Sequence, residues 1–312
     1  MLGFHRILVG IDTTDGELAP ATLAAWQQAL SVAAATGAEL LMITVSATPV
    51  AETEAILVED DKALGTLEQL KTIHSQFQTE ANERGVSTQS IFAHGRTWYE
   101  IIQTVLREQV ELVVVGCRNQ SRAERILFGS TAMKLLRKCP CPVWAVRPNA
   151  EEAIPTVLAA DDFSETGEQV VHLAVDLARL FDGRLLAVHS VRFPLTGGLS
   201  RTGASQDEVD EYRQQVIADA EQQLQERLAH TDHRTIAGGF QMRVTTGPAD
   251  LAIEELVRTE GVTLVVMGSL ARAGVPGILL GNTAERLLPL LSCSVLAIKP
   301  EGFVSPITLQ ES

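Results

Sequence analysis

The residues of this chain with the clearest chemical meaning are glycines and aspartates that occur in two matched sets. Gly116 and Gly129 recur as Gly268 and Gly281, and the two members of each pair are 152 positions apart. In both copies the second glycine stands directly before small polar residues that could open a helix. A glycine-bearing loop that leads into a helix N-terminus presents backbone N–H donors and a positive dipole end. This arrangement suits phosphate, so the sequence predicts an anion site twice.

The matched spacing extends over most of the chain and indicates a tandem duplication. The interval of 152 positions also separates three further pairs, which are Gly95 and Gly247, Cys141 and Cys293, and Pro148 and Pro300. Asp12 and Asp161, each of which follows an apolar run, are 149 positions apart. A chain of 312 residues can form two domains of a usual size. We place the first domain at residues 1–150 and the second at 151–312.

Each copy alternates apolar, strand-like runs with helical stretches. In the first copy we expect strands at 5–11, 39–45, 86–93, 111–115 and 142–146, and helices at 17–36, 61–83, 97–108 and 130–138. In the second copy we expect strands at 156–160, 184–189 and 295–298, helices at 168–181 and 283–291, and a further strand, helix and strand that end at Met267. A long amphipathic helix precedes these last three, with an apolar stripe at Val209, Tyr212, Val216, Ala220, Leu224 and Leu228.

This alternation predicts an α/β fold made of two tandem, doubly wound, Rossmann-like domains, each with a five-stranded parallel sheet. We expect the strand order 3-2-1-4-5, in which the first and fourth strands are neighbours where the winding direction reverses. Ligands bind at the carboxyl ends of the strands at such a point. Asp12 and the loop after Gly116 should therefore meet at one crevice, and Asp161 should meet the loop after Gly268 in the same way.

Composition excludes several classes of partner. The formal net charge is −14 and aromatic residues make up 4% of the chain, which argues against binding to nucleic acid. The N-terminus enters a strand-like run at once, and no apolar run approaches the roughly 20 residues needed to cross a bilayer. We therefore expect no membrane insertion and a cytoplasmic location.

The cysteines and histidines do not form a convincing metal site. We expect the four cysteines to be reduced and mostly buried, because disulfides are rare in the cytosol. The sharper alternative is a thiol sensor or a metal site built on Cys139 and Cys141. His230 and His233 have helical ligand spacing, but they stand near a helix end where solvated polar residues are common. We predict no metal site, and we expect His94 and His189 to be packing or surface residues.

The glycine loops and the aspartates together resemble the universal stress protein family. Its nucleotide-binding members carry Gly-x2-Gly-x9-Gly-(Ser/Thr) at this loop and an aspartate at the end of the first strand. The resemblance covers practically the whole chain, so the chain looks like a tandem universal stress protein. The segments 135–144 and 281–285 are especially similar to the E-type tandem members.

The resemblance implies that the chain binds ATP or a related adenine nucleotide, with Mg²⁺ as a further candidate cofactor. In the first copy, Asp12 would contact the nucleoside, Val45 would line the adenine pocket, and the phosphates would be held by Gly116, Gly129, Ser130 and Thr131. In the second copy, the matching residues are Asp161, Gly268, Arg272, Gly281 and Thr283.

Both copies depart from the family pattern. Asn119 replaces the second glycine of the first loop, which is a mild change because asparagine tolerates a left-handed backbone. Ala271 replaces it in the second loop, where a β-carbon would crowd a phosphate. Asn282 stands where a hydroxyl is expected, and Ser190 replaces the equivalent of Val45. Although Arg272 could pair with phosphate oxygens, these changes favour the first copy as the nucleotide site.

A purely structural interpretation stays open. Gly129 and Ser130 could form a turn and an N-cap, and Asp12 and Asp161 could each cap the helix that follows. Among functional alternatives, dedicated catalysis is the weaker one, because the chain has no Gly-x4-Gly-Lys-(Ser/Thr) loop and no obvious pair of carboxylates near the glycine loops.

We therefore expect a non-enzymatic stress-response protein that uses an adenine nucleotide as a switch or sensor. One alternative is a slow ATPase. The other is a scaffold that needs no nucleotide and binds proteins or small apolar ligands through the linkers 46–61 and 194–205.

The last strand of each copy would leave an open apolar edge if it were uncovered. Universal stress proteins resemble one another in pairing through this strand, so the resemblance implies that 143–146 and 295–298 pair within one chain as an intramolecular pseudo-dimer. We further expect two chains to form a homodimer and to contact protein partners that the sequence does not identify.

Overall fold

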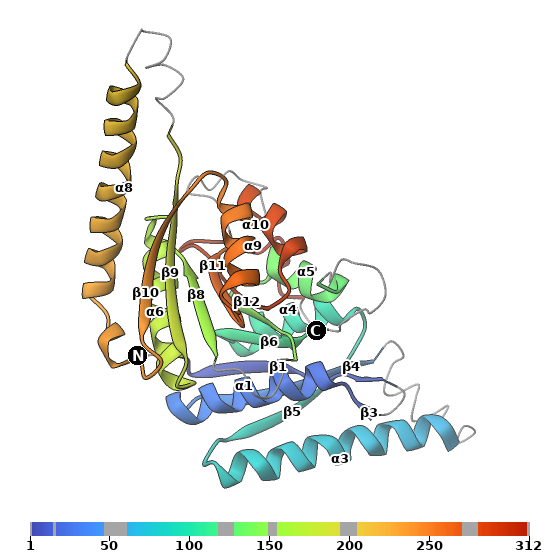
Figure 1. Cartoon of the computed structure of the whole chain (residues 1–312). Helices are drawn as coiled ribbons and strands as arrows, with labels where there is room; N and C mark the ends of the chain where they lie inside the picture. The colour runs from blue at the N-terminus through green and yellow to red at the C-terminus, as the bar shows by residue number, and fades with distance from the viewer. Residues whose placement is uncertain are drawn as a thin grey trace. The chain divides into compact units, whose positions relative to one another are not determined.

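The chain divides into two compact units (Figure 1). Unit 1 comprises Met1–Glu151 together with Ser294–Ser312, and unit 2 comprises Glu152–Cys293. The structure, a computed structural model, describes residues 2–14, 17–46, 61–117, 128–148, 155–193, 205–269 and 280–310, with the backbone alone at 61–67. Each unit is an α/β layer structure, as the alternation of strands and helices predicts.

Unit 1 follows the predicted order of elements. Its larger elements are β1 (Arg6–Gly10), α1 (Pro20–Thr36), β4 (Glu39–Ser46), α3 (Asp61–Glu83), β5 (Thr88–His94), α4 (Thr97–Glu108), β6 (Leu112–Gly116), α5 (Ser130–Lys138), β7 (Val143–Val146) and β12 (Ser294–Ile298). The strands are ordered β5-β4-β1-β6-β7-β12. All neighbours are parallel except β7 and β12, which are antiparallel. Helices α1 and α3 cover one face of this sheet, and α4 and α5 cover the other (Figure 1).

Unit 2 repeats the same plan. Its elements are β8 (Thr156–Ala160), α6 (Glu165–Leu180), β9 (Arg184–Val191), α8 (Gln206–Ala229), η1 (His233–Thr235), β10 (Phe240–Thr246), α9 (Ala249–Thr259), β11 (Leu264–Gly268), α10 (Asn282–Leu287) and η2 (Leu288–Leu290). Four parallel strands are ordered β10-β9-β8-β11. The predicted order 3-2-1-4-5 is confirmed for all five strands of the first copy and for the first four of the second.

The central strands are buried on both faces, which is why their sequences are nearly continuous apolar runs. Ile7, Leu8 and Val9 of β1 and Val113 and Val114 of β6 are fully buried. In unit 2, α8 buries Val209, Ala220, Leu224 and Leu228. These four belong to the stripe predicted from the sequence, and they dock the helix on β9 and β10.

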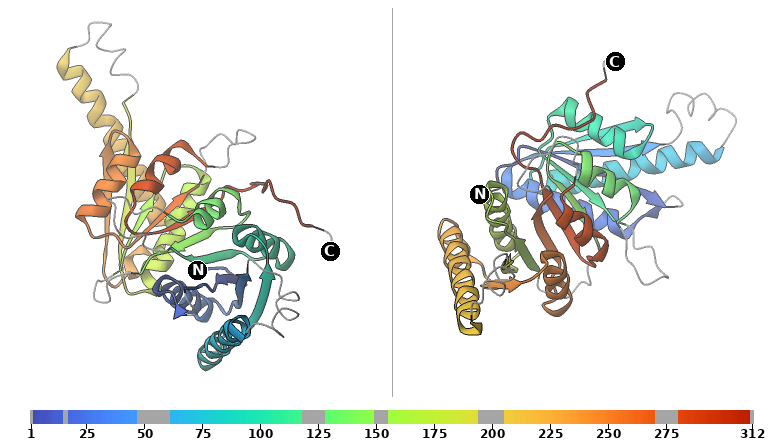
Figure 2. Two further views of the ribbon diagram at one scale, coloured as in Figure 1. Left: turned by 90° about the vertical axis from the view of Figure 1, so that its right-hand side faces the viewer. Right: turned by 90° about the horizontal axis from the view of Figure 1, so that it is seen from above.

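The final strand of the second copy belongs to unit 1 by its contacts. Strand β12 pairs antiparallel with β7, and Leu296 lies opposite Trp144. The sequence analysis predicted this pairing of the two last strands. It also assigned 294–312 to the second domain, which stays a prediction, whereas by its contacts this segment groups with unit 1, whose strand β7 pairs with β12. After β12 the chain continues as an extended segment (Figure 2).

Some helix starts differ from the predicted ones for clear local reasons. Helix α1 begins at Pro20 and not at residue 17, because Glu17–Leu18 (β3) pairs with Thr13–Thr14 (β2) in a small hairpin. Helix α6 begins at Glu165 and not at 168, since the Ser164 hydroxyl accepts a hydrogen bond from the Gly167 N–H and caps it.

The helix expected at 283–291 has a different end. It is α helical over Asn282–Leu287 and continues as the 3₁₀ turn Leu288–Leu290, which contains Pro289. Proline cannot donate the backbone hydrogen bond that a longer α-helix would need there.

Candidate functional site

In unit 1, the predicted residues meet in one cavity at the carboxyl ends of the strands. Asp12 follows β1, Gly116 ends β6, and Gly129 stands directly before α5, and all three line a cavity of about 330 Å³. The expectation that these distant segments converge is confirmed. Val45, Ser130 and Thr131 also line the cavity.

The lining of the unit 1 cavity has an apolar part and a polar part. Ile11, Ile43, Val45, Ile101 and Val115 supply the apolar surface. The polar part combines the Asp12 carboxylate with the hydroxyls of Thr22, Thr97, Ser130 and Thr131. Among the described lining residues, Asp12 has the one acidic side chain, and none has a basic side chain. The cavity could therefore hold a flat apolar group next to hydroxyl groups, with backbone N–H donors at the start of α5.

Gly116 and Gly129 differ in how much room a side chain would have at each position. A Cβ on Gly116 would lie 2.5 Å from the carbonyl oxygen of Ala21 and 2.8 Å from the amide nitrogen of Thr22. Gly116 therefore allows β6 to end directly against the first turn of α1. A Cβ on Gly129 would meet no heavy atom within 4 Å. A side chain at Gly129 would consequently project into open space beside the cavity without disturbing the fold.

Cys117 lines the same cavity and is an unreactive thiol. Cys117 follows β6 and is buried. Burial raises the pKa of its thiol to about 12, although Arg147 opposes this shift. The thiol therefore stays protonated at neutral pH and behaves as a small apolar side chain.

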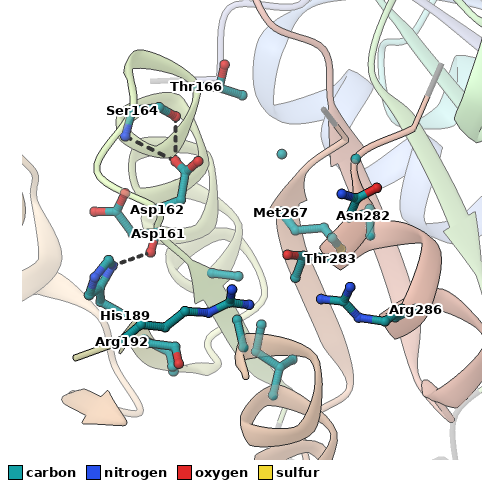
Figure 3. A pocket seen from close by; sticks show the side chains of 18 residues that line it. Asp161, Asp162, Ser164, Thr166, His189, Arg192, Met267, Asn282, Thr283 and Arg286 are labelled. Atoms are coloured by element: carbon teal, nitrogen blue, oxygen red, sulfur yellow. Dashed lines mark hydrogen bonds between the residues drawn. The ribbon is translucent and has the colours of Figure 1, made fainter. Parts of the chain in front are cut away.

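Unit 2 holds a larger cavity of about 620 Å³ in the corresponding place (Figure 3). Asp161 after β8, Gly268 at the end of β11, and Gly281, Asn282 and Thr283 at the start of α10 all line it. Ser190, which replaces the equivalent of Val45, lines it as well. Its hydroxyl donates to the Gly247 carbonyl at 2.9 Å, so the polar replacement is satisfied within the fold.

The aspartates of the two units differ in how their carboxylates are used. Asp12 is exposed, whereas the Asp161 side chain has no exposed surface. Asp161 Oδ2 lies 3.4 Å from Arg227 Nε of α8, and Oδ1 accepts a hydrogen bond from the Phe163 N–H at 2.8 Å. In Figure 3 the Asp161 carboxylate turns away from Asn282 and Thr283. This carboxylate therefore holds the turn before α6 and docks α8.

Aromatic packing closes this turn. His189 stacks on Phe163 with ring centroids 3.7 Å apart, and its Nδ1 lies 2.8 Å from the Asp161 carbonyl oxygen. Phe163 has a positive φ of 61°, an uncommon conformation that the stacking and the Asp161 hydrogen bond support. The expected packing role of His189 agrees with this arrangement, and His94 is exposed at the end of β5.

Two arginines that the sequence analysis did not select bring positive charge to the unit 2 cavity. Arg192 follows β9 and Arg286 lies on α10, and both line the cavity. Their guanidinium groups extend toward each other in Figure 3. Arg286 donates to both carboxylate oxygens of Asp250, with its Nε at 2.9 Å and its Nη2 at 3.2 Å.

Asp250 fixes this pair in place. The hydrogen bonds from Arg286 hold the pKa of the Asp250 carboxyl below its usual range, and the charge of Arg192 adds to this effect. One carboxylate thus faces two guanidinium groups, which leaves a local excess of positive charge. A signal for both arginines was present in the sequence. Arg192 is two residues after Ser190, just past the end of its strand, and Arg286 is one turn after Thr283 on its helix.

Three predicted site residues, Asn119, Ala271 and Arg272, lie outside the described residues. In the described part of the chain, no cluster of three or more histidine, cysteine or acidic side chains could hold a metal ion. None of the described helices combines the length and the apolar character that a membrane span requires.

Comparisons with known proteins agree with the duplicated architecture. The model of the universal stress protein family matches twice, at residues 3–147 and at 154–299. Universal stress protein E of Escherichia coli K12 is 28% identical over 234 residues, which cover 70% of each chain. A universal stress protein of Mycolicibacterium smegmatis is 26% identical over 303 residues and covers 95% of this chain.

Solved structures show the same fold over nearly the whole length. A functionally unknown protein from Pseudomonas aeruginosa PAO1 superposes with a TM-score of 0.68 at 23% identity, covering 96% of this chain and 93% of its own. A universal stress protein from Archaeoglobus fulgidus gives a TM-score of 0.59 at 18% identity over 94% of this chain and 98% of its own. With the two family matches that span both copies, the chain belongs to the universal stress protein family.

Proposed function

We propose that this chain is a non-enzymatic stress-response protein that binds ATP or a related adenine nucleotide as a switch or sensor. The observation that carries the proposal is the cavity at the strand ends of each unit. In both units it brings together the residues after the first strand, the end of the fourth strand and the start of the following helix. Cavities of this size are typical of small-ligand sites.

Each cavity could hold a nucleotide by itself, but the two would do so with different groups. In unit 1, Ile11, Ile43 and Val45 would face the base, and the exposed Asp12 would accept hydrogen bonds from ribose hydroxyls. The phosphates would lie at the start of α5, where Ser130 and Thr131 add hydroxyl donors. The described lining offers Mg²⁺ the Asp12 carboxylate alone, so we expect a metal ion to enter with the phosphates.

In unit 2, we propose that the phosphates lie between Arg192 and Arg286. Guanidinium groups bind phosphate oxygens through paired, charge-assisted hydrogen bonds. The engaged Asp161 carboxylate has no exposed surface for a ribose. Asp162 is exposed, but it already accepts hydrogen bonds from the Ser164 N–H and hydroxyl. The charge distribution therefore favours unit 2 as the stronger phosphate site, whereas the loop sequences favour the first copy.

The described lining residues favour binding over catalysis. Phosphoryl transfer requires a cationic clamp, a metal-holding acid and a positioned base in one place. The described lining of unit 1 supplies the acid Asp12 but no cation, and unit 2 supplies the cations but an aspartate that is committed to Arg227. Multiple turnovers of ATP to free phosphate would contradict this part of the proposal.

Nucleotide binding can be tested by thermal unfolding and calorimetry with ATP, ADP, AMP and adenosine. We expect ATP to stabilise the protein. The Gly129→Val variant should lose binding at unit 1 and Gly281→Val at unit 2, because a branched side chain would fill the space at the start of the helix. The Arg192→Gln variant should weaken ATP binding at unit 2 about tenfold, or about 1.4 kcal/mol, and leave adenosine binding nearly unchanged.

Arg258→Gln is the matched control, since Arg258 is an exposed arginine of α9 that does not line the cavity. If no adenine compound shifts the unfolding transition, the proposal is wrong and the nucleotide-independent scaffold takes its place. A homodimer, unidentified protein partners and a cytoplasmic location stay predictions, and light scattering tests the first of them.

A further inference from the structure

Two cysteines meet in unit 1 away from both cavities. Cys139 directly follows α5, and Cys141 comes two residues later, just before β7. Both thiols are buried and their sulfur atoms lie 3.6 Å apart. This is a van der Waals contact, about 1.5 Å longer than a disulfide bond. Such a pair differs from Cys117, for which the structure gives no sulfur neighbour among the described residues.

A buried lysine stands beside the thiol pair. In the antiparallel ladder Val295 lies opposite Ala145 and Ala297 lies opposite Val143, so continuation of the same register places Lys299 opposite Cys141. The Lys299 Nζ donates to the Leu136 carbonyl in the last turn of α5 at 2.5 Å. Lys299 as a whole is only 6% exposed. Fully buried lysines are rare unless a partner offsets the loss of hydration.

The C-terminal segment covers this lysine. The Phe303 ring centroid lies 4.7 Å from Lys299 Nζ, and the Ser305 hydroxyl donates to the Lys138 carbonyl at 2.7 Å. The ammonium group thus lies between the end of α5 and the segment that follows β12, and both thiols are near enough to influence its charge. In this surrounding, a thiolate on one of the cysteines is the negative charge that the lysine can pair with.

Burial and the neighbouring groups shift the pKa values of Lys299, Cys139 and Cys141. Burial lowers the pKa of Lys299 to about 8, and the two cysteines counteract this shift. Burial opposes ionisation of Cys139 as well, but the hydrogen bond from Cys141 and the Lys299 ammonium bring the pKa of Cys139 below its ordinary value. Burial and the neighbouring sulfur raise the pKa of Cys141. These directions favour a single thiolate in the pair; we take Cys139 as the nucleophile and Cys141 as the resolving thiol, and trapping of a sulfenic acid in the Cys141→Ala variant tests this assignment.

We propose that Cys139, Cys141 and Lys299 form a peroxide-reactive dithiol site that closes reversibly to a Cys139–Cys141 disulfide. The Cys139 thiolate attacks one oxygen of a hydroperoxide and the O–O bond breaks. The leaving group, which is hydroxide from hydrogen peroxide or an alkoxide from an organic hydroperoxide, takes a proton from Lys299, and Cys139 is left as a sulfenic acid. The Cys141 sulfur then attacks the Cys139 sulfur, and the sulfenic oxygen leaves as water with the Cys141 proton.

The net reaction consumes two thiols and one hydroperoxide and yields one disulfide and, with hydrogen peroxide, two waters. The two electrons pass from sulfur to the peroxide oxygen, and Lys299 regains its proton from solvent. Access selects the oxidant class. Cys139 is fully buried and Cys141 is 8% exposed, so an oxidant must be small enough to enter past Cys141, and a bulky disulfide such as oxidised glutathione cannot approach directly.

The test follows oxidation of the intact protein by mass spectrometry. With hydrogen peroxide, we expect the mass to fall by about 2 Da and peptide mapping to place the new bond between Cys139 and Cys141. Thiol reductants should reverse the change. In the Cys141→Ala variant, Cys139 should instead become trapped by dimedone as a sulfenic acid. Oxidised glutathione should react at least about tenfold more slowly than the peroxide.

Lys299→Met isolates the contribution of the ammonium group and should slow the peroxide reaction by about tenfold. A Cys117→Ala and Cys293→Ala double variant is the matched control, since it removes the other two buried thiols and should keep the full response. Peptide mapping of the wild-type chain needs no variant to fold. The proposal is overturned if the pair stays reduced at a peroxide dose that oxidises a cysteine in an unfolded peptide, or if Cys117 reacts as fast as Cys139.

Discussion

At the scale of single residues, equivalent positions in the two units have been put to different uses. Asp12 is exposed at its cavity, whereas Asp161 is buried against Arg227. Gly116 is required by the backbone of α1, whereas a Cβ on Gly268 would come no closer than 3.3 Å to the Thr166 side chain. Sequence position alone therefore does not determine what a matched residue does, because neighbouring side chains decide it.

His74 is a residue whose protonation should affect stability. It is buried in α3, its Nε2 lies 2.9 Å from Thr44 Oγ1, its Nδ1 lies 3.1 Å from Ser90 Oγ, and its ring stacks on Phe92. Burial lowers the pKa of His74 from 6.5 to about 4. Between these two values the unfolded chain binds a proton that the folded chain does not bind.

Stability should consequently fall as the pH drops from about 6.5 to about 4, by about 2 kcal/mol from this residue, and should not change for this reason above pH 7. Denaturant unfolding at several pH values measures the slope. His74→Gln keeps hydrogen-bonding groups but cannot titrate, so its slope should be shallower than that of the wild type. Equal slopes would show that His74 does not have a depressed pKa.

At the scale of elements, one ion pair joins the long helix α8 to the turn before α6. Arg227 Nε contacts Asp161, and Arg227 Nη1 donates to the Ser164 carbonyl at 2.9 Å. The guanidinium also lies 5.7 Å from the Phe163 ring centroid. A single side chain of α8 thus contacts three residues, Asp161, Phe163 and Ser164, of the turn that borders the unit 2 cavity.

Arg227→Met should destabilise the protein by about 2–3 kcal/mol, because it leaves the buried Asp161 carboxylate without its cation. Adding Asp161→Asn should recover part of this loss, since the double variant has no buried charge at this place. Thermal and denaturant unfolding of the four members of this double-mutant cycle measure the coupling. Additive effects of the two changes would contradict a direct interaction.

Much of the element structure could be predicted from sequence, and the failures have physical causes. The limits of α4 and α5 agree with the predicted 97–108 and 130–138, because strong periodicity and nearby glycines mark them. The duplicated glycine spacing also located both cavities. Arg192 and Arg286 were missed because a strand end and a helix that are far apart in the sequence bring them to one cavity. The ion pair of Asp161 was not foreseen because its partner Arg227 is 66 positions away on another helix.

At the scale of the whole molecule, the order of the chain and the composition of the compact units do not coincide. Strand β12 comes from the second sequence copy but belongs to unit 1, where it protects the β7 edge. The segment after it contacts α4 through Gln103, whose side chain donates to the Thr308 carbonyl and accepts from the Gln310 N–H. Unit 1 is therefore assembled from both ends of the sequence.

Deletion of residues 294–312 should expose the apolar β7 edge and cause association of chains. Light scattering should then report a higher state of association than that of the wild type, whichever state the wild type has, and unfolding should become less cooperative. Deletion of 306–312 is the control, since it keeps β12 and removes the Gln103 contacts. A truncated chain that keeps the wild-type mass and transition would contradict the role given to β12.

The position of β12 also affects how the chain can fold while it is being synthesised. Translation proceeds from the N-terminus, and a domain normally folds as soon as its last residue leaves the ribosome. Unit 1 cannot complete its sheet in this way, because one of its strands is residues 294–298, which are made near the end of synthesis. Until then the β7 edge of the growing chain is unpaired, so we expect nascent chains on neighbouring ribosomes to be able to associate through it.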